Sequence, residues 1–187
     1  DGAGEVFEFP AIVAEWGLAH FDDERLNATR TQARLGRPPR RLIGIAGPPG
    51  AGKTTLATAL AADLGAVHVP LDGFHLADVT LDRHGLRHRK GAPETFDVAG
   101  YVALLRRLRH DLTDPIFAPG FERDLEQPIA GAIEVPAETT TIVTEGNYLL
   151  LDAPGWREAA GELDEIWYVA LAPAVRRARL VARHVQF

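Results

Sequence analysis

The chain has 187 residues, enough for one domain with its own core, since a typical domain takes roughly 100–200 residues. Apolar residues make up 46% and charged residues 25%, a balance typical of a soluble globular protein and not of a disordered one. The net charge of −6 argues against attraction to nucleic acid, and no apolar run approaches the roughly 18 residues that span a bilayer. Without cysteine there is no disulfide or thiolate-bound zinc. We therefore expect a cytoplasmic protein without nucleic-acid or membrane partners.

Residues 1–40 are predicted to form a helical lead-in. Ala11–His20 and Asp22–Leu35 carry apolar residues at helical spacing, and Gly36 with the Pro38-Pro39 pair ends the second helix. Packing and a linker role are enough to explain this stretch, so no catalytic or binding function is expected in it. Residues 41–187 are predicted to form the functional domain.

Beyond residue 41, apolar runs that indicate strands alternate with helical stretches. The predicted strands are 42–46, 67–71, 140–144 and 166–171, and the predicted helices are 53–64, 97–110 and 174–185. Such alternation predicts an α/β fold, with a mainly parallel sheet and helices on both faces. Residues 115–137 contain four prolines and are expected to form loops with short strands rather than core.

Residues 47–54 (GPPGAGKT) fit the pattern G-x-x-x-x-G-K-[ST] between a predicted strand and a predicted helix. Glycines let the loop curl so that backbone N–H groups point at phosphate oxygens, and the following helix presents its positive end. Lys53 is expected to reach the β- and γ-phosphates and the Thr54 hydroxyl to bind magnesium. This context favours a nucleotide site, with ATP and Mg²⁺ as cofactors, over a chance glycine-rich turn. The predicted nucleotide-binding residues are Gly47, Pro48, Pro49, Gly50, Ala51, Gly52, Lys53, Thr54 and Thr55.

Two carboxylates follow predicted strands, where ligands gather in open α/β sheets. Glu145 ends a β-rich run, and its pairing with the P-loop favours a role at the metal. Asp72 follows the strand at 67–71, where an aspartate can accept a proton from an attacking hydroxyl. On spacing alone, a catalytic role for Asp72 and a simple turn formed by Asp72-Gly73 explain the sequence equally well.

Five sequence blocks carry a resemblance to one group of kinases. They are the P-loop, 72–75 (DGFH), 89–97 (RKGAPETFD), 118–123 (APGFER) and 145–148 (EGNY). In this order they resemble the uridine kinase, bacterial pantothenate kinase and phosphoribulokinase group, and most closely its bacterial nucleoside/nucleotide kinase branch, labelled as fructose-transport-system kinases. The resemblance implies a three-layer P-loop NTPase fold with a C-terminal lid helix. It also implies transfer of the γ-phosphate of ATP to a hydroxyl of a small metabolite: a nucleoside, a sugar or a pantothenate-like molecule.

The resemblance implies a role for each matching residue. Lys53 and Asp72 fall on catalytic positions, Asp72 as the base, while Thr54 and Glu145 fall on magnesium positions. The residues implied to bind the acceptor are Asp72, His75, Arg89, Lys90, Glu94, Asp97, Phe121 and Arg123. For His75 a role as a wall residue stays equally open. The charges of this set suggest a hydroxyl-rich acceptor, and an anionic one is compatible with them.

The last predicted helix carries Arg176, Arg177, Arg179 and Arg183. A solvated cationic face is the ordinary explanation of such a run. In the related kinases, however, this helix leads into a lid whose arginines close over the phosphates, which implies catalytic roles for Arg179 and Arg183. The chain stops at Phe187, where relatives complete the lid, so the domain is expected to be incomplete there and the adenine site is left unassigned. Phe121-Glu122-Arg123 also departs from the aromatic and histidine pattern of uridine and pantothenate kinases.

Other functions fit parts of the sequence. A GTPase-type switch needs an Asn-Lys-x-Asp element, and none occurs. The net charge weighs against an ATPase that processes nucleic acid. A non-catalytic ATP-binding regulatory module, or an ATPase acting in a complex, stays open. The expected partner is a small-molecule acceptor, and a homodimer is also left open.

Overall fold

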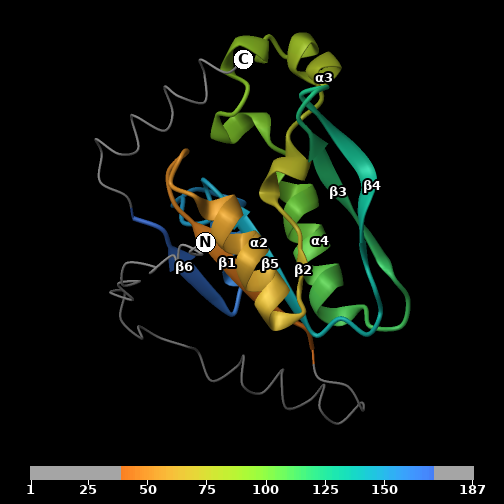
Figure 1. Ribbon diagram of the computed structural model, residues 1–187. Coiled ribbons are helices and arrows are strands. Elements are labelled where there is room, and N and C mark those ends of the chain that lie inside the picture. The colour runs from red at the N-terminus through yellow and green to blue at the C-terminus, as the bar shows by residue number, and fades with distance from the viewer. Residues whose placement is uncertain (1–38, 171–187) are drawn as a thin grey trace, which may run out of the picture.

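The computed structural model describes residues 39–170, which form a parallel sheet with helices on both sides and a separate hairpin (Figure 1). The strand order is β2-β5-β1-β6, and every pair in this sheet is parallel. Its strands are β1 (Arg41–Ala46), β2 (Val67–His68), β5 (Thr141–Gly146) and β6 (Glu165–Tyr168). After their first residues, the two central strands β1 and β5 are buried throughout, because helices cover both of their faces.

Helices on the two faces of the sheet make three layers. The α-helices are α2 (Lys53–Leu64), α3 (Asp78–Arg83), α4 (Val98–His110) and α5 (Trp156–Gly161), and the 3₁₀ turns are η1 (Leu71–Phe74), η2 (Arg87–Arg89) and η3 (Pro93–Thr95). On one face, Ala57 of α2 packs with Ile45 and Val143. On the other, Leu42 shares a core with Leu105 of α4 and with α5. The predicted α/β P-loop fold is confirmed.

Helix α4 is the amphipathic helix predicted for residues 97–110. The Asp97 carboxylate caps its start by accepting a 2.8 Å hydrogen bond from the backbone N–H of Gly100. The buried side chains of this helix are Tyr101, Val102, Leu104, Leu105 and Leu108. The Tyr101 hydroxyl lies 2.8 Å from Thr144 Oγ1, which joins the helix to β5.

Residues 115–137 were expected to form loops with short strands outside the core; they form two long strands of a hairpin, and part of it belongs to the core. Strands β3 (Ile116–Glu122) and β4 (Gln127–Val135) pair antiparallel, with one irregularity between Ala118 and Gly120. Ile116, Ala118 and Val135 are fully buried against the main core. The intervening Pro119 falls at that irregularity, and a two-stranded sheet has only edge strands, which tolerate proline. Pro119 is therefore compatible with the hairpin.

Arg40, just before β1, is a cation that is only 1% exposed. Its guanidinium donates to five backbone carbonyl oxygens at 2.7–3.2 Å. These oxygens belong to Leu108, Asp111, Pro136, Ala137 and Thr139. The first two lie at the end of α4, where the helix dipole favours a cation. Arg40 thus ties α4 and the connection between β4 and β5 to the start of β1.

Two predicted strands differ in length from the observed ones. The strand predicted at 67–71 pairs only over β2. The backbone N–H of Val69 still donates to Val143 at 2.8 Å, and Pro70 then leads into η1. The strand predicted at 166–171 is β6, and residue 171 lies outside the described residues. The lead-in helices before residue 36, the helix 174–185 and Arg176, Arg177, Arg179 and Arg183 also lie outside them. Among residues 39–170, no helix is long and apolar enough to cross a membrane.

Candidate active site

The P-loop connects β1 to α2, as its motif requires. Gly50 and Gly52 have φ angles of 78° and 97°, in the left-handed region that favours glycine, and Gly52 immediately precedes α2. The turn is closed by a 3.2 Å hydrogen bond from the Ala51 N–H to the Pro48 carbonyl. A phosphate group fits such a curled loop at a helix N-terminus because the free N–H groups there carry partial positive charge.

The Lys53 ammonium is held inside this loop. Lys53 is only 7% exposed. Its Nζ atom donates to the Pro48 carbonyl at 3.2 Å and to Asn147 Oδ1 at 2.6 Å. Asn147 follows β5 directly and was not singled out from the sequence. Because this hydrogen bond joins residues 94 positions apart, the sequence offered only one signal for it, an amide directly after the Glu145-Gly146 pair.

The two predicted magnesium ligands lie side by side. The Thr54 hydroxyl donates a 3.0 Å hydrogen bond to Glu145 Oε1. Burial raises the pKa of Glu145, and the negative charge of Asp72 raises it further, while Lys53 opposes the shift. A hydroxyl and a carboxylate suit Mg²⁺, which prefers oxygen ligands and keeps several waters and substrate phosphates in its shell. No group of three or more acidic, His or Cys side chains within residues 39–170 could hold a metal alone, so phosphate oxygens would have to complete such a site.

Asp72 lies in η1, between β2 and the hairpin. Its carboxylate oxygen Oδ2 is 3.7 Å from Nη2 of Arg123, which follows β3. The next residue, Gly73, packs so closely on the hairpin that a Cβ there would lie 2.3 Å from the Pro119 carbonyl oxygen. This close approach fixes where the hairpin lies relative to η1.

His75 and Phe121 belong to a set of packed rings beside Asp72. The His75 ring lies 4.0 Å from the Phe96 ring and 5.0 Å from the Phe121 ring, measured between centroids. Its Nδ1 atom is 2.8 Å from the backbone carbonyl of Asp72. Phe96 in turn packs against Tyr148 and Trp156. These contacts give His75 a structural place in the wall of the site.

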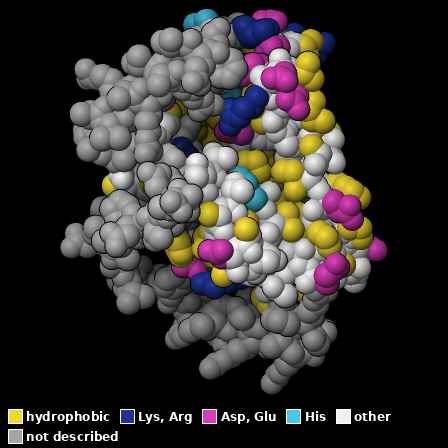
Figure 2. Space-filling view, viewed as in Figure 1, with side chains coloured by type: hydrophobic (Ala, Val, Ile, Leu, Met, Phe, Trp, Pro, Cys, Tyr) yellow, Lys and Arg dark blue, Asp and Glu magenta, His cyan; other side chains and the backbone are white. Residues whose placement is uncertain are grey.

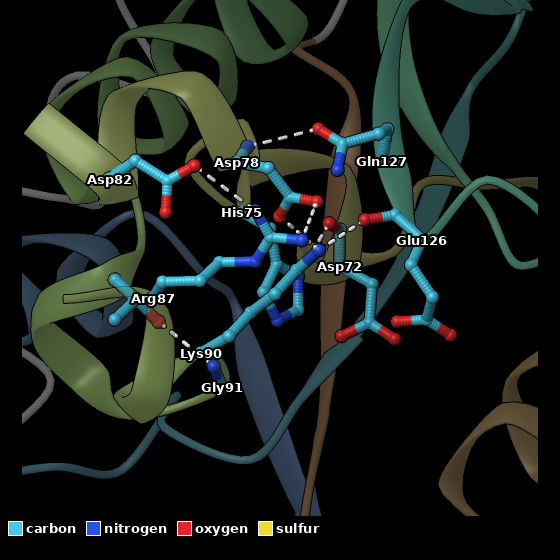
Figure 3. Close-up of polar contacts among 10 residues, drawn as sticks. Asp72, His75, Asp78, Asp82, Arg87, Lys90, Gly91, Glu126 and Gln127 are labelled. Carbon is cyan, nitrogen blue, oxygen red and sulfur yellow. Dashed lines mark hydrogen bonds and ion pairs between the residues drawn. The ribbon is translucent and has the colours of Figure 1, made fainter.

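The segment around Lys90 forms a polar network with α3 and the tip of the hairpin (Figure 3). Lys90 Nζ donates to Asp78 Oδ1 at 2.8 Å and to the backbone carbonyl of Glu126, and it lies 5.7 Å from the Phe121 ring centroid. The hydrogen bond from Lys90 holds the pKa of Asp78 below its ordinary value, although burial opposes the shift. Charged side chains of both signs gather at the end of the molecule where α3 lies (Figure 2).

The other residues predicted to bind the acceptor have partners of their own. Arg89 and Glu94 form an ion pair at 2.5 Å, and Asp97 is the cap of α4. Tyr148, which has no role in the sequence predictions, donates from its hydroxyl to the Gly91 carbonyl at 2.6 Å. The segment that carries Arg89 and Lys90 is therefore attached to the residues that follow β5.

The structure brings part of the predicted site together. Thr54 and Glu145 are in contact, Lys53 is held beside the same strand end by Asn147, and Asp72 faces Arg123. Arg89 and Glu94 pair with each other and Asp97 caps α4, so these three side chains are engaged elsewhere. Arg179 and Arg183 lie outside the described residues.

Comparison with known proteins identifies the family. Residues 43–95 match the profile of the ATPase family associated with various cellular activities (AAA), which covers the P-loop region. The protein named "putative uridine kinase C227.14" of Schizosaccharomyces pombe is 34% identical over 158 residues, 78% of this chain and 67% of that protein. The ATP-dependent kinase-like protein notR' of Aspergillus versicolor is 37% identical over 122 residues, 62% of this chain and 71% of that protein.

A solved structure agrees with these relatives. The protein described as a "putative fructose transport system kinase" from Silicibacter sp. TM1040 is 41% identical to this chain, with a TM-score of 0.75. The similarity covers 85% of this chain and 81% of that one. With the P-loop, the parallel sheet and these relatives in view, the chain belongs to the P-loop kinase family that includes uridine kinase-like and pantothenate kinase homologues.

Proposed function

We propose that this protein transfers the γ-phosphoryl group of ATP to a hydroxyl of a small metabolite, with magnesium as cofactor. One observation carries the proposal: the groups that such a transfer needs meet at the carboxyl ends of three neighbouring strands. Lys53 follows β1, Glu145 lies near the end of β5 with Thr54 bound to it, and Asp72 follows β2. This edge of the sheet is where ligands bind in open α/β folds.

Each group has a distinct task in the reaction. The acceptor hydroxyl attacks the γ-phosphorus, its proton passes to the Asp72 carboxylate, and the bond to the β–γ bridging oxygen breaks to release ADP. Lys53 and the loop N–H groups neutralise negative charge on the phosphates. Thr54 and Glu145 would hold magnesium, which supplies further charge neutralisation on the β- and γ-phosphates when bound. Arg179 and Arg183 are proposed to add cations from the lid.

The test is ADP release with Mg-ATP over a panel of nucleosides, sugars, pantothenate and acidic or phosphorylated acceptors. Asp72→Asn should abolish acceptor-stimulated turnover and leave ATP binding nearly intact, since the base acts on the acceptor and not on the nucleotide. Loss of ATP affinity equal to the loss of turnover would overturn the role of Asp72. ATP binding without stimulation by any acceptor would instead favour a non-catalytic ATP-binding module.

A further inference from the structure

Among the cations predicted for the acceptor site, Arg123 differs from the others. Arg89 is paired with Glu94 at 2.5 Å, and Lys90 donates to Asp78 at 2.8 Å. The Arg123 guanidinium has a 3.7 Å ion pair with Asp72, a distance too long for a hydrogen bond, and a longer-range attraction to the Glu145 carboxylate. Within the part of the chain that the structure describes, its donors make no hydrogen bond, and half of the side chain is exposed.

The backbone that carries Arg123 is held in place by the fold on both sides of this residue. β3 packs on η1 at Gly73, where the Pro119 carbonyl leaves no room for a Cβ. The tip of the hairpin is held by Lys90, which bonds to the Glu126 carbonyl, and by Gln127, which accepts from the backbone N–H of Asp78 at 3.1 Å (Figure 3). Arg123, between these two attachments, is therefore presented beside Asp72.

The rings beside Asp72 pack on one another. His75 lies between Phe96 and Phe121, and Phe96 is only 7% exposed. Phe96 also packs on Tyr148 and Trp156. Phe96, at the centre of this cluster, is therefore buried and not available to stack on the base of a nucleoside acceptor.

From the free donors of Arg123 and their distance to Asp72, we propose that the acceptor is a small hydroxy acid or hydroxyalkyl phosphate whose anionic group binds Arg123 while its hydroxyl binds Asp72. The inference rests on the proposed function, because Asp72 is the base only if the protein is a kinase. A guanidinium binds carboxylate and phosphate with two parallel hydrogen bonds. With each hydrogen bond about 2.8 Å long, a hydroxyl and an acid oxygen separated by roughly 3–5 Å reach both residues. A neutral polyol offers the Arg123 donors only uncharged hydroxyl acceptors, whose hydrogen bonds are weaker than those of an anion.

The experiment compares matched acceptors that differ in the acid group alone. One series is glycerate, glycerol 3-phosphate and glycerol, and the other is the open-chain set gluconate, glucitol 6-phosphate and glucitol. Binding is measured by calorimetry in the presence of Mg-ADP, and ADP release is measured with Mg-ATP. We expect at least one acid to bind at least about tenfold more tightly than its neutral partner, since a hydrogen-bonded charge pair is the difference between them. Comparing the carboxylate with the phosphate in each series shows which of the two anions the site binds.

Variants of Arg123 then assign the effect. Arg123→Gln should weaken binding of the acid about 10- to 100-fold and leave binding of the neutral partner unchanged, while Arg123→Lys should restore part of the loss. Arg107→Gln, a change of an exposed arginine on α4, is the matched control and should alter neither.

The outcomes separate the two proposals. Equal affinity for acid and neutral partner, or no binding of any acid, overturns the anionic acceptor. So does an Arg123→Gln protein that loses affinity for ATP and not for the acid, because the guanidinium would then serve the γ-phosphate. Binding of an acid that depends on Arg123 but gives no ADP overturns the kinase and retains an anion site at Arg123.

Discussion

The Thr54 hydroxyl donates a 3.0 Å hydrogen bond to the Glu145 carboxylate, which joins the first turn of α2 to the end of β5. Glu145 is only 4% exposed, and its charge is opposed by burial and by Asp72. A cation bound beside this carboxylate would therefore be stabilised by its negative charge. In the absence of that cation, its charge is a cost to the folded state.

This cost predicts a pH dependence of stability. The folded pKa of Glu145 is raised above the ordinary value of 4.5, so between these two values the folded protein binds more protons than the unfolded chain. Stability therefore falls as pH rises through this window. Without Mg²⁺ and nucleotide, Tm of the wild type should fall relative to that of Glu145→Gln as pH rises above 4.5. Thermal unfolding over a pH series measures this.

The control for this prediction is Glu134→Gln, because Glu134 lies exposed on β4. It should follow the wild-type pH dependence. A Glu145→Gln protein whose Tm tracks the wild type at every pH would show that Glu145 carries no such cost. Glu145→Gln should also raise the Mg²⁺ concentration needed for half-maximal turnover.

Asn147 is predicted to position Lys53. Its amide oxygen accepts a 2.6 Å hydrogen bond from the ammonium, and hydrogen bonds to charged groups are worth about 1.5–3 kcal/mol. Asn147→Ala should lower kcat/KM for ATP about tenfold or more, while Asn147→Asp, which keeps an acceptor oxygen, should lose less ATP affinity. Nucleotide binding and steady-state kinetics check both. Unchanged ATP kinetics in Asn147→Ala would contradict this prediction, and would show that Lys53 keeps its position without the Asn147 hydrogen bond while it still donates to the Pro48 carbonyl.

Gly73→Ala should displace the hairpin from η1. The new Cβ would meet the Pro119 carbonyl oxygen at 2.3 Å, and overpacking of this kind costs about 1–3 kcal/mol. We expect a lower Tm and a raised KM for the acceptor, with ATP binding retained, because Arg123 and Phe121 move away from Asp72.

Gly85→Ala is the contrasting variant for Gly73→Ala. Gly85 has a φ of 67°, and a Cβ added there would have nothing within 4 Å. Alanine at this position therefore adds backbone strain and no collision, at a cost of about 1–2 kcal/mol. It should lower Tm and leave acceptor kinetics alone. If both variants change acceptor kinetics equally, general destabilisation is the explanation and the Gly73 contact is not.

Arg40→Met should destabilise the fold strongly. The substitution leaves five buried or half-buried carbonyl oxygens without their donor, and we expect a loss of about 3 kcal/mol or more in the free energy of unfolding. Urea unfolding gives the value. Arg41→Met is the matched control, because Arg41 is exposed and pairs with Glu165 at the surface, where an ion pair is worth about 0–1 kcal/mol. Similar losses in the two variants would contradict a special role for Arg40.

Local patterns predicted much of this structure. The P-loop, β1, α2 and α4 are each set by a few consecutive residues: glycines, a buried apolar run, or apolar positions at helical spacing. The hairpin was missed because its prolines mark turns in a local pattern, whereas the buried side chains of Ile116 and Val135 find their partners only in the folded protein. Asn147 and Arg40 were missed for the same reason, since every hydrogen bond that defines them spans at least 68 positions.

The four residues from Glu145 to Tyr148 contact two parts of the protein at once, the start of α2 and the segment around Gly91. Glu145 bonds to Thr54, Asn147 to Lys53, and Tyr148 to Gly91 in the segment of Arg89 and Lys90. A change in this tetrapeptide must therefore remain compatible with the proposed nucleotide and metal sites and with the proposed acceptor segment together. The hairpin that carries Arg123 is held by its contact at Gly73, by its buried side chains and by the hydrogen bonds of Glu126 and Gln127. The other exposed residues near its tip, Arg123 among them, take no part in those contacts, which makes them the positions to vary when a kinase for a different acceptor is sought.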